Sequence, residues 1–326
     1  MRQPSAFTRR VPRARSGPTP SSASGPTLRR CWKPNKRRSR SSEASATLPA
    51  EGTLAREGTI DSADGTKLSY RAWPKAGADV TFAVVHGLGE HSRRYERFAL
   101  GMSRHGFATF AVDLRGHGKS PGPRGHVNSW KQWTDDVGAF VEHVESIAGG
   151  EVVPVGHSFG GAVLLSTILA DKLAGTKRFV VSSPALRVKA PVPGWKVALA
   201  KATSRIVPKL ALDNEVDPKV LSRIPDVVEA YRTDPLVHSK ISSRLYSEWI
   251  AACKRIFEHA GEITVPFLIL AGTDDRLIDP EGSQHLHRLS ASVSEFRLLE
   301  GRYHEPFNDV DNEEVFAVIA DWLSKS

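Results

Sequence analysis

The segment at residues 151–170, EVVPVGHSFGGAVLLSTILA, places Ser158 between two glycines where two apolar stretches meet. Residues 152–155 are typical of a strand buried on both faces, and residues 161–170 of a helix packed on the same sheet. A strand that becomes a helix with almost no loop must bend sharply, and glycines beside the turn permit the bend. G-x-S-x-G in this setting predicts that Ser158 is a nucleophile held exposed in a strained conformation.

A serine hydroxyl attacks at neutral pH only with a general base beside it, and that base needs an acid to orient it. In folds with this strand–serine–helix turn, the acid follows the serine along the chain and the histidine follows the acid. His304 lies in the loop GRYHEPF after the predicted strand SEFRLLEG, which favours it as the base. His285 and His287 fall within a predicted helix and are expected on the surface.

The acid is expected in ILAGTDDRLID, where Asp274, Asp275 and Asp279 all follow a buried strand. Aspartates in such loops usually stabilise turns, so at least one of the three is expected to do so. We assign Asp275 as the acid, with Asp274 as the alternative.

An acyl-transfer site also needs two N–H donors for the developing oxyanion. The backbone N–H groups of Phe159, directly after Ser158, and of Leu88, in the glycine-rich loop HGLGE, are expected to supply them. The predicted chemistry is acyl transfer to water through an acyl-serine, on esters, thioesters or amides. It requires no metal and no organic cofactor.

Elements that could position these residues alternate between strand and helix over most of the chain, which predicts an α/β fold with a mostly parallel sheet covered by helices on both faces. Ligands bind such sheets at the carboxyl ends of the strands. The unusual polar residues do follow predicted strands: His86, Asp113, Ser158, Asp275 and His304. The alternation is lost between about residues 185 and 239, which predicts an inserted helical cap.

The chain of 326 residues has a net charge of +9, but this charge is unevenly spread. Residues 1–50 contain 12 of the 45 Lys and Arg residues and a single acid, Glu43. We therefore predict a disordered basic arm, rich in Ser, Pro and Arg, over residues 1–54 and a hydrolase domain over residues 55–326. The arm is typical of an organelle-targeting segment or of an extension without function, and nucleic-acid binding is not expected.

Several other classes of protein are disfavoured. There is no apolar run of about 18 residues, which argues against a membrane span. Cys31 and Cys253 are not expected to pair, which fits a reducing compartment. A cytoplasmic or peripheral membrane location is expected, and nothing in the sequence indicates an oligomeric state. No CxxC pair, HExxH motif or P-loop is present.

Five motifs together resemble the monoacylglycerol lipase and lysophospholipase group of α/β hydrolases: HGLGEHSRRY, DLRGHGKS, GHSFGG, GTDDRL and YHEPFND. The resemblance runs from about residue 58 to 323. It implies Ser158 as nucleophile, Asp275 as acid and His304 as base, with Leu88 and Phe159 as the oxyanion donors.

The same resemblance implies that Glu90 and Arg94 line a polar, glycerol-holding end of the substrate pocket. A third residue of that end, a histidine in the animal enzyme, is Phe307 here. Phe159 also replaces the methionine that usually follows the serine.

The function expected from these residues is hydrolysis of carboxylic esters, with monoacylglycerols as the first candidates. A lysophospholipase, a broad carboxylesterase and a serine aminopeptidase would use the same triad. A non-catalytic ligand receptor on this fold is a further alternative. An epoxide hydrolase or haloalkane dehalogenase would need an aspartate where Ser158 stands.

The predicted cap contains a basic and apolar stretch at residues 186–212 that has six Lys and Arg residues and no acid. Trp195 and several aliphatic residues are interleaved with these charges. This pattern favours an element that contacts a lipid surface. The alternative is a helix that covers the pocket and shows its lysines to water.

Overall fold

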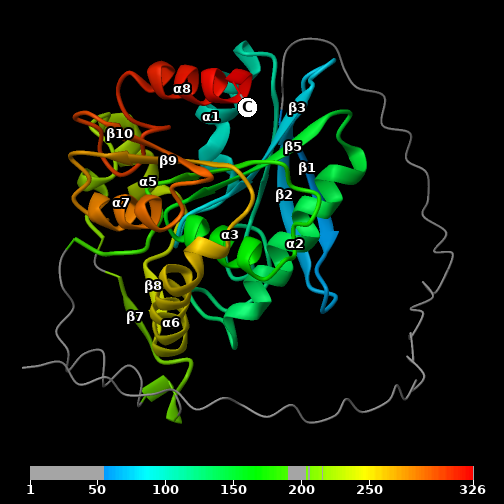
Figure 1. Ribbon diagram of the computed structural model, residues 1–326. Coiled ribbons are helices and arrows are strands. Elements are labelled where there is room, and N and C mark those ends of the chain that lie inside the picture. Colours follow the sequence, from blue (N-terminus) through cyan, green and yellow to red (C-terminus); the bar gives the residue numbers. More distant parts are fainter. Residues whose placement is uncertain (1–54, 190–202, 205, 215, 326) are drawn as a thin grey trace, which may run out of the picture. The chain divides into compact units, whose positions relative to one another are not determined.

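The computed structural model describes residues 55–189, 203–204, 206–214 and 216–325 (Figure 1). The predicted arm at residues 1–54 lies outside the described residues. So do Trp195, Lys196, Lys201 and Arg205 of the basic stretch in the predicted cap.

An eight-stranded sheet forms the centre of the molecule, with strands in the order β1-β2-β4-β3-β5-β6-β9-β10. The strands are β1 (Arg56–Asp61), β2 (Lys67–Trp73), β3 (Val80–Val85), β4 (Ala108–Val112), β5 (Glu151–His157), β6 (Phe179–Ser182), β7 (Ala211–Asp213), β8 (Lys240–Ser242), β9 (Phe267–Gly272) and β10 (Ser294–Leu299). The α-helices are α1 (Glu96–Arg104), α2 (Trp130–Ile147), α3 (Phe159–Leu169), α5 (Pro225–Thr233), α6 (Ser243–His259), α7 (Pro280–Leu289) and α8 (Asn312–Lys325).

The sheet is parallel from β4 to β10, and β1 and β2 extend it as an antiparallel hairpin that turns at Asp64-Gly65. Every residue of β3, β6 and β9 is buried, as expected for strands covered on both faces. Helices α1 and α8 pack on one face of the sheet and α2, α3 and α6 on the other (Figure 1). The predicted α/β-hydrolase architecture is confirmed.

The described part of the predicted cap is not purely helical. It contains α5 and a short strand, β7, which pairs antiparallel with β8 just beyond the predicted boundary. A strand of three residues has no measurable periodicity, so the sequence pattern did not indicate it. The backbone N–H of His238 donates to the carbonyl of Gly89 at 2.8 Å, which joins this segment to the glycine-rich loop after β3.

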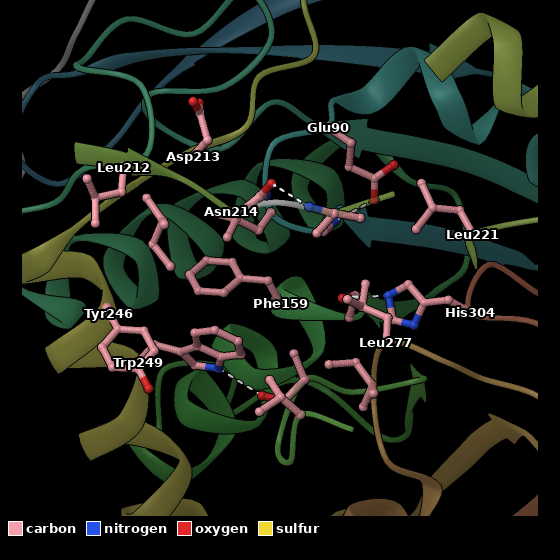
Figure 2. Close-up of a pocket in the computed structure, with 18 of the residues that line it drawn as sticks. Glu90, Phe159, Leu212, Asp213, Asn214, Leu221, Tyr246, Trp249, Leu277 and His304 are labelled. Atoms are coloured by element: carbon pink, nitrogen blue, oxygen red, sulfur yellow. Dashed lines mark hydrogen bonds between the residues drawn. The ribbon is translucent and has the colours of Figure 1, made fainter. Parts of the chain in front are cut away.

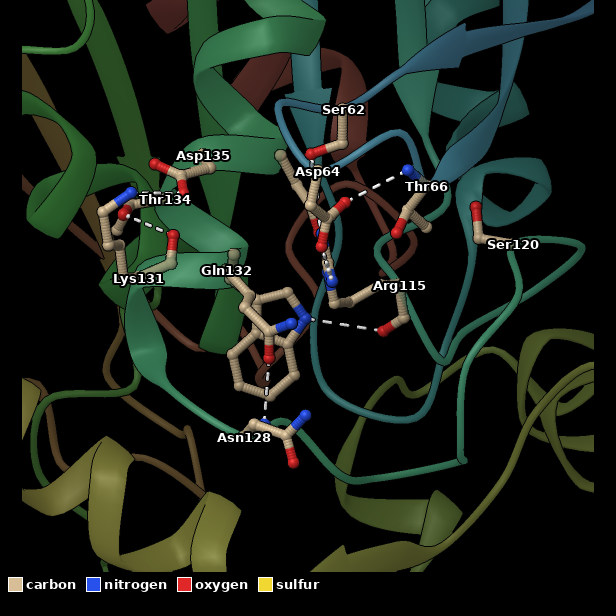
Figure 3. A network of polar contacts seen from close by, with 12 residues as sticks. Ser62, Asp64, Thr66, Arg115, Ser120, Asn128, Lys131, Gln132, Thr134 and Asp135 are labelled. Carbon is tan, nitrogen blue, oxygen red and sulfur yellow. Dashed lines mark hydrogen bonds and ion pairs between the residues drawn. The ribbon is translucent and has the colours of Figure 1, made fainter.

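A buried ionic network joins the first hairpin to helix α2 (Figure 3). The guanidinium of Arg115 donates two hydrogen bonds of 2.6 Å to Asp136 on α2, and a third of 2.8 Å to Asp64 in the hairpin turn. The hydroxyl of Ser62 also donates to Asp136. Because Asp136 is fully buried, its charge depends on these donors.

We predict that Asp136→Ala lowers the free energy of unfolding by roughly 3–5 kcal/mol, because it leaves a buried guanidinium without its main partner. The neighbouring Asp135 pairs with Lys131 and Lys172, and Asp135→Ala is the matched control, expected to cost about 1 kcal/mol or less. Chemical denaturation of the two variants makes the comparison. Equal decreases in the free energy of unfolding would show that the buried network stabilises the fold no more than the ion pairs of Asp135 do.

Candidate active site

Ser158 lies at the joint between β5 and α3 with a φ of +52°, a left-handed conformation that is rare for a residue with a side chain. Its backbone N–H donates to the carbonyl of Ser182, and its own carbonyl accepts the N–H of Ala185 at 2.8 Å. A Cβ atom on Gly160 would lie 2.3 Å from the carbonyl oxygens of Val85 and His86. The turn is thus packed directly against the end of β3, which only glycine at position 160 allows.

The structure brings together three residues that lie far apart in the sequence. His304 Nε2 lies 2.9 Å from Ser158 Oγ, and His304 Nδ1 lies 2.8 Å from Asp275 Oδ2. The other oxygen of Asp275 accepts the backbone N–H groups of Leu277 and Ile278, each at 2.8 Å. These bonds fix the carboxylate so that one oxygen points at the imidazole.

The remaining candidates from the sequence lie elsewhere. Asp274 is exposed and its side chain is not on His304, whereas Asp279 caps the N-terminus of α7. His285 on α7 is exposed, as predicted, and His287 on the same helix is partly exposed. The geometry therefore selects Asp275 and His304 from the candidates.

The neighbours of His304 raise its basicity and set its tautomer. Burial alone would lower the pKa of His304. The Asp275 carboxylate, together with Glu305 and Glu90, has the opposite and larger effect, so the pKa lies above its usual value. Burial would raise the pKa of Asp275, but His304 and the two backbone donors bring it below its usual value. An ionised Asp275 can only accept a hydrogen bond, so Nδ1 of His304 carries a proton and Nε2 is left to accept from Ser158.

The glycine-rich loop after β3 passes directly beside Ser158. A Cβ atom on Gly87 would lie 3.3 Å from Ser158 Cβ, and one on Gly89 would lie 2.2 Å from the carbonyl oxygen of His238. Leu88, between these glycines, lines the same cavity as Ser158 and Phe159. Phe159 begins α3, so its N–H belongs to the first turn, where no intrahelical acceptor is available. Two backbone donors beside a serine can bind an oxyanion.

Glu90 holds this loop in place through hydrogen bonds of its buried carboxylate. Its Oε1 accepts the N–H of Gly87 at 2.6 Å and the hydroxyl of Tyr95 at 2.9 Å, while its Oε2 accepts from Arg94 at 2.8 Å. Burial opposes the charge and is the largest single effect, but Arg94, His157, His86 and the N–H of Gly87 together outweigh it, and the pKa of Glu90 falls to about 2. Glu90 lines the cavity near Ser158, and the Arg94 side chain lies behind it, outside the lining.

Sequence reasoning missed Glu305, which also lines the cavity. Its two carboxylate oxygens accept from the two terminal nitrogens of Arg94 at 2.7 and 2.8 Å. The only sequence signal was its position directly after His304, since nothing marked it as the partner of a residue more than two hundred positions earlier.

Phe307 is not at the cavity, contrary to its selection as a substrate-binding residue. It is buried among the aromatic rings of Phe98 and Phe316, with its ring centre 4.8 Å from that of Phe98. An apolar ring at this position is more stable in the core under α1 and α8 than beside the carboxylates of the polar end.

The cavity that opens from Ser158 has a volume of about 570 Å³. Figure 2 shows the aromatic side chains of Phe159, Tyr246 and Trp249 on one side and His304 with Leu277 on the other. Further aliphatic lining comes from the cap and the strand that follows it: Leu210, Leu212, Val216, Leu221 and Ile241. Such a cavity can bury a long aliphatic chain whose reactive end lies at Ser158.

In the part of the chain that the structure describes, no group of three or more His, Cys, Asp or Glu side chains is arranged to hold a metal ion. The same part contains no helix that is both long enough and apolar enough to cross a membrane.

Comparison with known proteins places this geometry in a family. The serine aminopeptidase S33 family matches residues 77–311. A human monoglyceride lipase is 34% identical over 81% of this chain and 88% of its own length. An uncharacterized abhydrolase domain-containing protein of Dictyostelium discoideum is 32% identical over 80% of this chain, which spans only 28% of that longer protein.

A solved structure shows the same relationship in three dimensions. The crystal structure of a Paleococcus ferrophilus monoacylglycerol lipase superposes with a TM-score of 0.68 at 35% identity, and the match covers 83% of this chain and 98% of that one. The chain belongs to the serine aminopeptidase S33 family of α/β hydrolases and is similar to the monoacylglycerol lipases among them.

Proposed function

We propose that this protein hydrolyses monoacylglycerols to a fatty acid and glycerol through an acyl-serine intermediate. The observation that carries the proposal is the hydrogen-bonded series Ser158–His304–Asp275, of which Ser158 and His304 line a large apolar cavity. The monoglyceride and monoacylglycerol lipases to which the chain is similar support the choice of substrate.

In the proposed mechanism, His304 Nε2 takes the proton from Ser158 Oγ while this oxygen attacks the carbonyl carbon of the ester. The negative charge that develops on the carbonyl oxygen is bound by the N–H groups of Leu88 and Phe159. His304 then gives its proton to the leaving alcohol, and the acyl group remains on Ser158. A water molecule, deprotonated by His304, then attacks the acyl carbon. His304 returns this proton to Ser158 Oγ as the bond from Oγ to the acyl group breaks, and the fatty acid is released.

The two ends of the cavity match the two parts of such a substrate. The aromatic and aliphatic lining accepts the acyl chain, and its burial supplies binding energy in proportion to the apolar area removed from water. Near Ser158 the lining becomes polar, with Glu90, His157 and Glu305. The alcohol part of the ester would lie at this polar end.

Exposed apolar residues of the cap support a contact with lipid. Ile206 is 80% exposed and Leu212 is 67% exposed, and Val207 and Leu210 between them are also exposed. Leu210 and Leu212 also line the cavity, so the exposed apolar surface continues into the binding site. We include in the proposal that this surface inserts at the headgroup boundary of a membrane, from which the substrate enters.

A panel of oleoyl esters tests the substrate assignment. Monooleoylglycerol is expected to be hydrolysed with a higher kcat/KM than a diacylglycerol, a lysophosphatidylcholine or an aminoacyl amide, because it alone joins one acyl chain to a small uncharged alcohol. Ser158→Ala should abolish all turnover without a change in melting temperature. A clear preference for the lysophospholipid or the amide would replace the proposal with that activity.

The assignment of the acid is tested by two matched variants. Asp275→Asn should lower kcat/KM by roughly 10⁴-fold, because the amide no longer holds the reactive tautomer of His304. Asp274→Asn is the control and should stay within a fewfold of the wild type. Steady-state kinetics on a soluble short-chain ester decide the matter, and a larger loss in Asp274→Asn would overturn the assignment.

The lipid contact is tested with the full-length protein and vesicles that contain anionic lipid. Ile206→Ser combined with Leu212→Ser should reduce the partition coefficient onto the vesicles, measured by sedimentation, by roughly tenfold, because two large apolar side chains are lost. Leu298→Ser, at an exposed leucine on β10 that does not line the cavity, is the control. Equal binding by the double variant and the control would contradict the proposed contact.

A further inference from the structure

We infer that Glu305, together with Glu90, makes the polar end of the cavity selective for uncharged alcohols and excludes esters whose alcohol carries a phosphate. This inference rests on the proposed function and narrows its substrate class. The selectivity comes from the arrangement of two carboxylates around a single guanidinium, which the following contacts define.

Arg94 lies between the two carboxylates, and both of its terminal nitrogens donate hydrogen bonds to them. Its Nη1 donates to Glu90 Oε2 at 2.8 Å and to Glu305 Oε1 at 2.7 Å, and its Nη2 donates to Glu305 Oε2 at 2.8 Å. The ring of Tyr231, on α5 of the cap, lies against the guanidinium with its centre 4.6 Å away. The Arg94 side chain is only 9% exposed and is not part of the cavity lining, so it cannot reach an anionic ligand in the cavity.

The balance of charge at this end is negative. Two carboxylates line the cavity and one guanidinium neutralises one of them. His157, in the same lining, adds no positive charge at neutral pH, because burial and the neighbouring His304 lower its pKa to about 4. The lining cation Arg276 is exposed, so solvent and salt screen its charge.

The two carboxylates also keep acceptor sites for hydroxyl groups. Each carboxylate oxygen can accept about two hydrogen bonds. Among the described residues, Glu90 Oε2 and Glu305 Oε1 each accept one bond, both from the same nitrogen of Arg94, whereas the other two oxygens each accept two. The two open sites are therefore adjacent, as the neighbouring hydroxyls of glycerol would require.

A phosphate on the alcohol would meet this end unfavourably. A phosphate dianion has only acceptor oxygens and cannot donate a hydrogen bond to the carboxylates. Its negative charge is also repelled by theirs, and a buried site screens this repulsion little. An uncharged diol donates to both open sites and meets no repulsion. We expect each unit of charge to alter kcat/KM by roughly tenfold at such distances.

The test compares 1-oleoylglycerol with 1-oleoylglycerol 3-phosphate, which differ only in the phosphate. The measured quantity is the ratio of their kcat/KM values, in which effects on the triad cancel. The wild type should prefer the uncharged ester by roughly 100-fold or more, and Glu305→Gln should narrow the ratio by roughly tenfold. Glu229→Gln is the control. It removes an exposed carboxylate from α5, the cap helix that carries Tyr231, and should leave the ratio unchanged.

A second readout is the pH dependence of the same ratio, and its measurement in the wild type does not depend on the folding of a variant. The phosphate gains its second charge with a pKa near 6. The ratio of the two kcat/KM values should therefore rise between pH 5 and pH 8, and rise less in Glu305→Gln.

Three results would overturn the inference. One is a wild type that hydrolyses both esters at similar rates, with the monoacylglycerol activity itself intact. Another is an equal ratio in the wild type and in folded Glu305→Gln. If neither oleoyl ester is cleaved while a short-chain nitrophenyl ester is, the proposed function fails and this inference fails with it.

Discussion

The left-handed backbone of Ser158 is the constraint on which the rest of the site depends. A residue with a side chain in this conformation costs about 1–3 kcal/mol, and it persists only when its surroundings leave no alternative. Here the surroundings are rigid: the central strands β5 and β6 hold the turn by backbone hydrogen bonds, and Gly160 lies against the carbonyls at the end of β3. The same packing that fixes the serine backbone brings the glycine-rich loop after β3 to its side.

A buried ionic cluster then fixes the parts that surround the serine. Glu90 holds the loop through Gly87, and Arg94 connects Glu90 to Glu305, which directly follows His304. Tyr231 of the cap lies on Arg94. One guanidinium thus joins three parts of the site: the loop that would bind the oxyanion, the loop that carries His304, and the cap. Breaking such a buried group by removing one partner is costly, so the cluster holds these parts in register.

Local patterns in the sequence predicted the sheet, the turn at Ser158 and the identity of His304, because each depends on residues close together in the chain. The contact between His304 and Asp275 spans only one strand and one helix, so the order of elements was enough to bring them to the same edge. The choice between Asp274 and Asp275 depended on which carboxylate the loop buries, which no periodic pattern encodes. The resemblance to a known family favoured the residue that the geometry selects.

Other features depend on contacts between distant segments and could not be read from the chain. Glu305 pairs with Arg94, which lies more than two hundred positions earlier in the chain, and a glutamate in a loop usually faces water. Phe307 was placed at the substrate-binding end by its position three residues after His304, yet its ring packs with Phe98 and Phe316 in the core. Strand β7 is three residues long and exists because β8 pairs with it.

The central claim is that His304 and Asp275 activate Ser158 as a nucleophile. Its most direct test is covalent labelling with a fluorophosphonate, which reacts with an activated serine hydroxyl and not with ordinary surface serines. The intact mass should increase by one adduct, peptide mapping should place it on Ser158, and His304→Ala should slow the labelling by orders of magnitude. No adduct, or an adduct on another residue, would contradict the account and indicate a protein that keeps the fold without the chemistry.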